Sequence, residues 1–109
     1  MIVLAGSYHM PAQRFDEAKT DYFDWLISSS RAESGVLQYE LGRDFDDPTK
    51  IVCVAVLTDV AALAVHRDLH TAKWTAFASK FGVYDWDVQH YECPQVKMAD
   101  PHEDALASS

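Results

Sequence analysis

Residues 51–57 read Ile-Val-Cys-Val-Ala-Val-Leu, and this almost wholly apolar run decides the fold. An apolar run of this length, rich in β-branched residues, predicts a central strand that is covered on both faces. Thr58 and Asp59 follow at once, and either side chain can cap a helix that begins at Val60. The sequence therefore predicts a central strand that leads directly into a helix.

The helix that begins at Val60 keeps its helical spacing of apolar residues to about Phe81, with a break possible near Asp68, and Gly82 ends it. The chain then alternates between two faces over residues 84–93, which predicts a strand. One face of this strand carries Tyr84, Trp86, Val88 and His90.

Before the central strand, residues 44–49 predict a turn, and Val36–Arg43 predicts a strand with Leu37, Tyr39 and Leu41 on one face. Farther upstream, an amphipathic helix is expected to start near Pro11 and to end near Glu33-Ser34-Gly35, where Gly35 can take the left-handed cap conformation. The alternating, mostly apolar residues 2–9 predict the first strand.

The predicted order of elements is β-α-β-β-α-β. Right-handed crossovers then give a ferredoxin-like α+β fold, in which a four-stranded antiparallel sheet carries both helices on one face. Residues 1–93 form this domain, and residues 94–109 form a polar tail that is mobile or reaches a partner subunit. The other sheet face is apolar and uncovered, so we expect a homodimer in which a second copy covers it.

Charge and composition exclude several classes of partner. The formal net charge of −8 argues against nucleic acid and disfavours an anionic membrane surface. The apolar N-terminal run is too short for a transmembrane helix and lacks a preceding basic region, so we expect a cytoplasmic protein. Cys53 and Cys93 form no CxxC motif and are expected to be small buried hydrophobic residues.

The second helical region contains the strongest candidate for a functional site. One stripe with spacings of 3, 4, 4, 3 and 4 residues comprises Leu63, His66, His70, Trp74, Phe77 and Phe81. This stripe is expected to face the sheet, which places two imidazoles and an indole where packing alone would use Leu or Val. Either they are satisfied core residues, or they line a mostly apolar small-molecule cavity.

Other residues of the candidate site are less certain from sequence. Phe77 is expected in the core. Because it also lies on the stripe, it is a candidate substrate-binding residue as well. Tyr8, Tyr39 and Trp86 lie on predicted strands and could line the cavity or the dimer face. His66 and His70 have the spacing of a metal pair, but no Cys or HExxH motif supplies further ligands, so no metal is expected.

Three stretches resemble the antibiotic biosynthesis monooxygenase family. The stretch Arg31–Leu41, RAESGVLQYEL, is similar to the family's "EPGCLSYEL" stretch after the first helix. Residues 44–57 are similar to its hairpin and third strand, and Asp59–His70, DVAALAVHRDLH, resembles its segment with two histidines. The likeness extends over residues 2–92 and differs from the usual pattern at Asp68-Leu69 and Thr71.

The resemblance implies a dimeric α+β barrel with a cavity between the sheet and the helices of each subunit. Several family members oxidise phenols, anthrones or quinols with O₂ and use neither metal nor flavin. The resemblance thus implies a cofactor-independent monooxygenase that acts on a small aromatic, quinol or polyketide-like compound. In this chain His66 or His70 would act as the base or as the donor that stabilises the anion, and Trp74, Tyr39 and Phe77 would bind the substrate.

Two alternatives remain open at the level of sequence, because fold resemblance does not fix the reaction. The same histidines could serve an isomerase or lyase of a small oxygenated metabolite. The chain could also be a non-catalytic dimer that binds a small molecule. Haem-degrading proteins of similar fold need an Asn, a Trp and an iron-binding His. The positions that match the first two are Ser7 and His66, and the residues after Trp74 include no histidine before Gly82, so the resemblance does not imply haem degradation.

Overall fold

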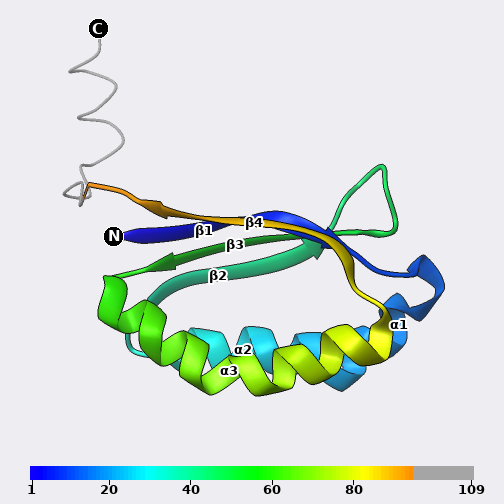
Figure 1. Ribbon diagram of the computed structural model, residues 1–109, viewed down its shortest axis with the longest axis horizontal. Helices are drawn as coiled ribbons and strands as arrows, with labels where there is room; N and C mark the ends of the chain where they lie inside the picture. Colours follow the sequence, from blue (N-terminus) through cyan, green and yellow to red (C-terminus); the bar gives the residue numbers. More distant parts are fainter. Residues whose placement is uncertain (95–109) are drawn as a thin grey trace, which may run out of the picture.

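The computed structural model describes residues 1–94 and contains one four-stranded antiparallel sheet (Figure 1). Its strands are β1 (Ile2–His9), β2 (Val36–Arg43), β3 (Lys50–Leu57) and β4 (Tyr84–Glu92), in the order β2-β3-β1-β4. This arrangement confirms the ferredoxin-like α+β fold, with an open sheet in the single chain. The tail predicted for residues 94–109 lies, apart from Pro94, outside the described residues.

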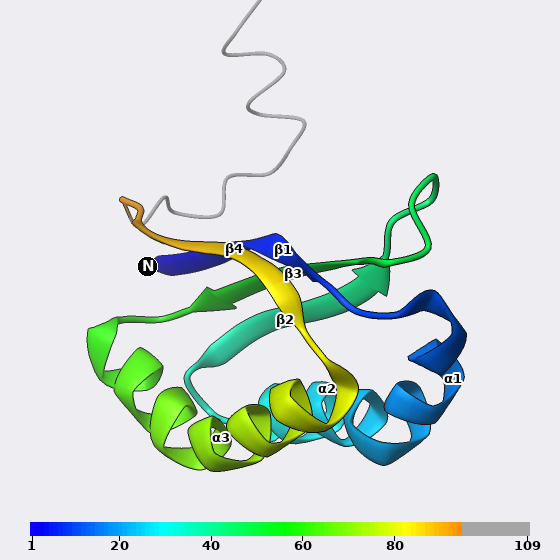
Figure 2. The ribbon, with the colours of Figure 1, turned by 45° about the vertical axis from the view of Figure 1, so that its right-hand side comes forward.

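The helices form a single layer beneath one face of the sheet, as both ribbon views show (Figures 1 and 2). The long helix α3 (Val60–Phe81) connects β3 to β4. The first helical region consists of a 3₁₀ turn η1 (Ala12–Arg14), α1 (Phe15–Ala18), a π-helical turn η2 (Lys19–Phe23) and α2 (Asp24–Ala32). A π turn inside a helix is uncommon and was not predicted from the sequence.

Helix α3 is continuous and capped at both ends. The Asp59 carboxylate accepts a hydrogen bond from the backbone N–H of Ala62 at 2.8 Å. At the other end Gly82 takes the left-handed conformation with φ 68°. The predicted caps are thus confirmed, while the break considered near Asp68 does not occur, so the whole histidine stripe lies on one continuous helix.

The predicted role of Gly35 is wrong. Helix α2 ends at Ala32, Glu33 leaves it in an extended conformation, and Gly35 does not have a positive φ. Glycine is required there for space instead, because a Cβ at Gly35 would overlap the Cβ of Ala62 on α3. The close approach joins the end of α2 to the start of α3, and it brings Glu33 beside the histidines of α3.

A register shift in β2 corrects the predicted face of Leu37. The pairing of β2 with β3 shifts between Val36 and Gln38, so that Leu37 is an extra residue in the ladder. Leu37 is therefore exposed, whereas Tyr39 is buried toward the helices. Strict alternation predicted one face for both residues, and the bulge breaks that alternation.

The two faces of β3 differ in how they are covered. Ile51, Ala55 and Leu57 point toward the helices and are buried in the core. Val52 and Val54 lie on the opposite face, where each is 38% exposed. The predicted apolar, helix-free sheet face is therefore present.

Among the described residues, no helix has an apolar stretch long enough to cross a membrane.

Candidate active site

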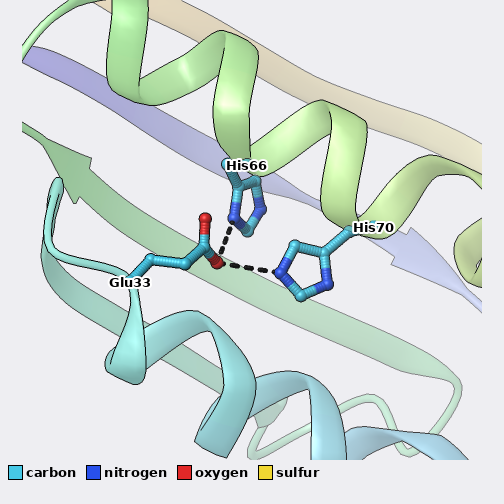
Figure 3. Close-up of side chains that lie close together, drawn as sticks. All are labelled: Glu33, His66 and His70. Carbon is cyan, nitrogen blue, oxygen red and sulfur yellow. Dashed lines mark hydrogen bonds and ion pairs between the residues drawn. The ribbon is translucent and has the colours of Figure 1, made fainter.

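Two histidines and one carboxylate meet between α2 and α3, as Figure 3 shows. One oxygen of Glu33, Oε2, lies 3.0 Å from Nδ1 of His66 and 2.8 Å from Nε2 of His70. The side chains are 9%, 12% and 6% exposed for Glu33, His66 and His70 respectively. This Glu33–His66–His70 cluster is thus a nearly buried ionisable group at the interface of the two helices.

The positions of these residues follow from the local fold. His66 and His70 are four residues apart on the continuous helix α3, so they project from the same face. Glu33 is the first residue beyond α2, and its backbone N–H donates to the carbonyl of Ser30. No sequence pattern singled out Glu33, although it lies within the stretch Arg31–Leu41 that resembles the monooxygenase family. The close approach of Gly35 to Ala62, two residues after Glu33, lies beside this contact with the histidines.

The hydrogen bonds fix the tautomer of each ring. A carboxylate can only accept, so Nδ1 of His66 and Nε2 of His70 must carry the protons that they donate. In its neutral form His66 therefore has an unprotonated Nε2, which can accept a proton. Burial lowers the pKa of His66, partly offset by the hydrogen bond and charge of Glu33. His66 is thus held as a neutral potential base.

His66 also borders a small cavity between the sheet and the helices, called the inner cavity below. Its volume is about 110 Å³. The apolar and aromatic part of its wall consists of Leu4, Leu26, Ala55, Trp74, Trp86 and Val88. The polar part consists of Tyr8, Tyr39, Cys53, His66 and His90. A mostly apolar cavity with a few convergent polar groups is the usual form of a small-molecule site.

Tyr8 is the most deeply buried polar residue of the inner cavity. Its ring forms a cluster with two tryptophans, with centroids 4.9 Å from Trp74 and 5.5 Å from Trp86, and it stacks on the latter. Its hydroxyl is buried and has no hydrogen-bond partner within residues 1–94. Burial raises the pKa of Tyr8 well above its ordinary value, so the phenol stays protonated and can donate.

The other polar groups at the cavity are also neutral or lie at its edge. Burial raises the pKa of the Cys53 thiol to about 11, so it is not a thiolate near neutral pH. Burial, followed by the charge of Arg67, lowers the pKa of His90. A nitrogen of the Arg67 guanidinium lies 3.0 Å from Nε2 of His90, and this pair is exposed. The cavity therefore combines a neutral interior with a cation near its edge.

Comparison with known proteins shows which solved structures share this fold. No protein-family model matches the chain, and no curated protein matches it. Solved structures do match over most of the chain. A crystal structure named antibiotic biosynthesis monooxygenase has a TM-score of 0.66 at 22% identity, and covers 89% of this chain and 100% of its own. This chain has the fold of the antibiotic biosynthesis monooxygenases.

Two further structures share the antibiotic biosynthesis monooxygenase fold, and both are named "putative antibiotic biosynthesis monooxygenase". The one from Deinococcus radiodurans has a TM-score of 0.73 at 16% identity, and covers 92% of this chain and 99% of its own. The one from Nitrosomonas europaea has a TM-score of 0.73 at 17% identity, with coverages of 86% and 99%. At these identities the likeness concerns the fold.

Within this antibiotic biosynthesis monooxygenase fold, the residues predicted for the site separate into two groups. His66, Trp74 and Tyr39 line the inner cavity. His70 does not line it, and packs instead against the Trp25 ring at 5.3 Å between centroids. Phe77 stacks on Tyr22 at 4.4 Å and belongs to the core rather than to the cavity wall. The structure thus gives the two histidines different surroundings.

The cluster also offers a set of metal ligands that the sequence analysis did not find. One ligand atom each from Glu33, His66 and His70 lies within 4.8 Å of the others. The third ligand missing from the sequence argument is therefore present in the fold, as the carboxylate at the end of α2. In addition, Oε1 of Glu33 and Nδ1 of His70 are buried without a hydrogen-bond partner among residues 1–94.

Proposed function

We propose that this chain is a cofactor-independent monooxygenase that oxidises a small aromatic or quinol-like compound with O₂. The observation that supports the proposal is the double contact of His66. One ring nitrogen is held by Glu33, and the residue borders an enclosed aromatic cavity. A carboxylate that fixes the tautomer of a histidine base is an established way to organise proton abstraction.

In the proposed reaction His66 acts first. Its Nε2 removes the proton of a phenolic or enolic hydroxyl, while Glu33 stabilises the imidazolium that forms. The resulting anion transfers one electron to O₂, which gives a substrate radical and superoxide. The two recombine to a peroxide anion, which takes the proton back from the His66 imidazolium, and the resulting hydroperoxide loses water to leave a carbonyl. One O₂ is thus consumed, one oxygen atom enters the substrate and the other leaves as water.

Tyr8 and the tryptophans provide the environment for this reaction. The Tyr8 hydroxyl is a donor without a partner in the described residues, and it is suited to bind the substrate oxygen as negative charge develops there. Trp74 and Trp86 enclose the cavity with aromatic surface. A water-poor aromatic cage holds a flat substrate and keeps the radical pair together.

The volume of the inner cavity limits the substrate. At about 110 Å³ it is well below that of a typical drug-sized site. A single substituted ring is therefore the preferred guest in this conformation. Trp86, which is 53% exposed, forms part of the cavity wall.

The experiment that tests this function measures O₂ consumption with an oxygen electrode. Purified chain is mixed with substituted phenols, hydroquinones and anthrone, each against a protein-free blank and a His66→Ala variant. We expect at least one compound to give O₂ uptake that depends on His66. Product formation that proceeds without O₂ would instead indicate an isomerase or lyase, and binding without turnover would indicate a non-catalytic binding protein.

A further inference from the structure

We propose that Glu33, His66 and His70 form a binding site for one divalent transition-metal ion. Two imidazole nitrogens and one carboxylate are a common donor set for Zn²⁺, Fe²⁺ and related ions. Glu33 directly follows α2, whereas His66, 33 residues later, and His70 lie on α3, and the three donor atoms converge at one point (Figure 3).

Two of the three donor separations are close to those of a shared ion, and all three donor atoms lie within 4.8 Å of one another. Ligand atoms that bind one metal at 2.0–2.1 Å lie about 2.9–3.4 Å apart in octahedral or tetrahedral geometry. Oε2 of Glu33 lies 3.0 Å from the His66 nitrogen and 2.8 Å from the His70 nitrogen. Side-chain rotations that bring the two imidazole nitrogens closer together would complete the three-ligand site.

The charge of the cluster also favours a cation. Glu33 is nearly buried, and in residues 1–94 its hydrogen-bond and ion-pair partners are the two histidines. The neighbouring Arg31 binds Glu40 and the Tyr39 carbonyl instead. A buried carboxylate needs a compensating positive charge. A divalent ion would supply it while both imidazoles remain neutral, and the unpartnered Oε1 would be available as a further ligand.

An entry path to the proposed site exists on the side away from the inner cavity. An open surface groove of about 550 Å³ is bordered by Glu33, Gly35, Thr58, Ala62 and Leu69. Glu33 borders this groove, whereas His66 borders the inner cavity. An ion could reach the carboxylate from the groove without passing the aromatic residues.

The ion would also regulate the proposed oxidation, and this consequence rests on the proposed function. A metal on Nδ1 of His66 leaves the ring proton on Nε2, the atom that must accept a proton from the substrate. The metal-loaded chain is therefore expected to be inactive as a base catalyst, and a chelator is expected to restore turnover. The binding test below has no activity readout, so it succeeds or fails independently of the oxidation.

The test is calorimetric titration of the chelator-treated full chain with ZnCl₂, supported by the visible spectrum of the Co²⁺ complex. We expect one Zn²⁺ per chain, and at least about tenfold weaker binding in Glu33→Gln and in His70→Ala. His9→Ala is the matched control, because His9 and Asp47 form another His–carboxylate pair, 3.9 Å apart, and its affinity should be unchanged.

Glu33→Gln nearly conserves shape, and circular dichroism of each variant checks that the fold is retained. A Co²⁺ spectrum with d–d bands and no thiolate charge-transfer band would support nitrogen and oxygen ligands. The proposal is overturned if wild-type protein binds no Zn²⁺ at micromolar concentrations. It is equally overturned if the folded Glu33→Gln and His70→Ala variants bind Zn²⁺ as tightly as wild type.

Discussion

At the scale of single residues, the two histidines are expected to differ. His66 borders the inner cavity, whereas His70 contacts Glu33 and Trp25 behind it. His66→Ala should lower kcat/KM by about 10²–10⁴, the usual contribution of a positioned base. His70→Ala should lower it less, because Glu33 keeps its hydrogen bond to His66. Steady-state kinetics of both variants measures this, and equal losses would contradict the assignment.

Tyr8 provides a separate test of how the substrate is bound. Tyr8→Phe removes only the hydroxyl that is buried without a partner in the described residues. The stability of the fold should therefore be nearly unchanged, since no described hydrogen bond is lost. If the hydroxyl binds the developing oxyanion, kcat should fall by more than KM rises. Unchanged kcat would show that Tyr8 only packs against the tryptophans.

The pH dependence of the reaction is set by His66 and the groups that face it: Glu33, His70 and Tyr39. Burial lowers the pKa of His66 from 6.5, while Glu33 partly offsets this change. Since the neutral form is the active base, kcat/KM should keep its neutral-pH value as the pH falls past 6.5, and should decline only at lower pH. Glu33→Gln removes the charge that raises the pKa, so the acid limb should move to still lower pH. An acid limb with its midpoint above pH 6.5, the ordinary pKa of histidine, would contradict this prediction.

At the scale of elements, the pairing of β1 with β4 depends on Gly6. A Cβ at this position would overlap the backbone oxygen of Asp87 and lie 2.7 Å from the Cα of Val88. Gly6→Ala should therefore lower the free energy of unfolding by about 1–3 kcal/mol, as overpacking does. The matched control is Gly42→Ala, since a Cβ there meets nothing within 4 Å. Urea denaturation of both variants measures the difference, and equal midpoints would refute it.

The elements also show where sequence reasoning succeeds. Local signals fix Asp59 and Gly82 as helix caps, because both act within one turn of their own residues. The bulge at Leu37 and the spatial role of Gly35 depend on contacts with β3 and α3, which no local pattern contains. The alternation of β4 does predict that Trp86, Val88 and His90 share one face, and all three line the inner cavity.

The same distinction applies to the site. The stripe on α3 predicts that His66 and Trp74 face the sheet, because helical periodicity extends over the whole element. It cannot show that His70 turns toward Glu33, since that contact spans 37 residues of sequence. It also cannot separate Phe77 from the cavity, because the separation is made by Tyr22 in the π turn. Contacts between elements thus carry the information that the sequence pattern lacks.

At the scale of the whole molecule, the bare sheet face should produce a homodimer. Val52, Val54 and Tyr91 are exposed there, although no helix in residues 1–94 covers them. Contiguous apolar surface of this kind marks an interaction site. Analytical ultracentrifugation of the wild-type chain should show a dimer at micromolar concentration, and Val54→Asp should give a monomer. The control is Val60→Asp, which changes an exposed valine at the start of α3. A monomeric wild type would refute the dimer.

The order of the strands has a consequence for synthesis on the ribosome. β4 supplies Trp86, Val88 and His90 to the wall of the inner cavity, and it pairs with β1 from the opposite end of the sequence. A nascent chain that lacks β4 therefore exposes one long side of β1, with Tyr8 and Trp74 unshielded. Such an unpaired edge is prone to aggregation until the last strand emerges. The pairing of β4 with β1 thus completes the pocket and protects the growing polypeptide at the same late step.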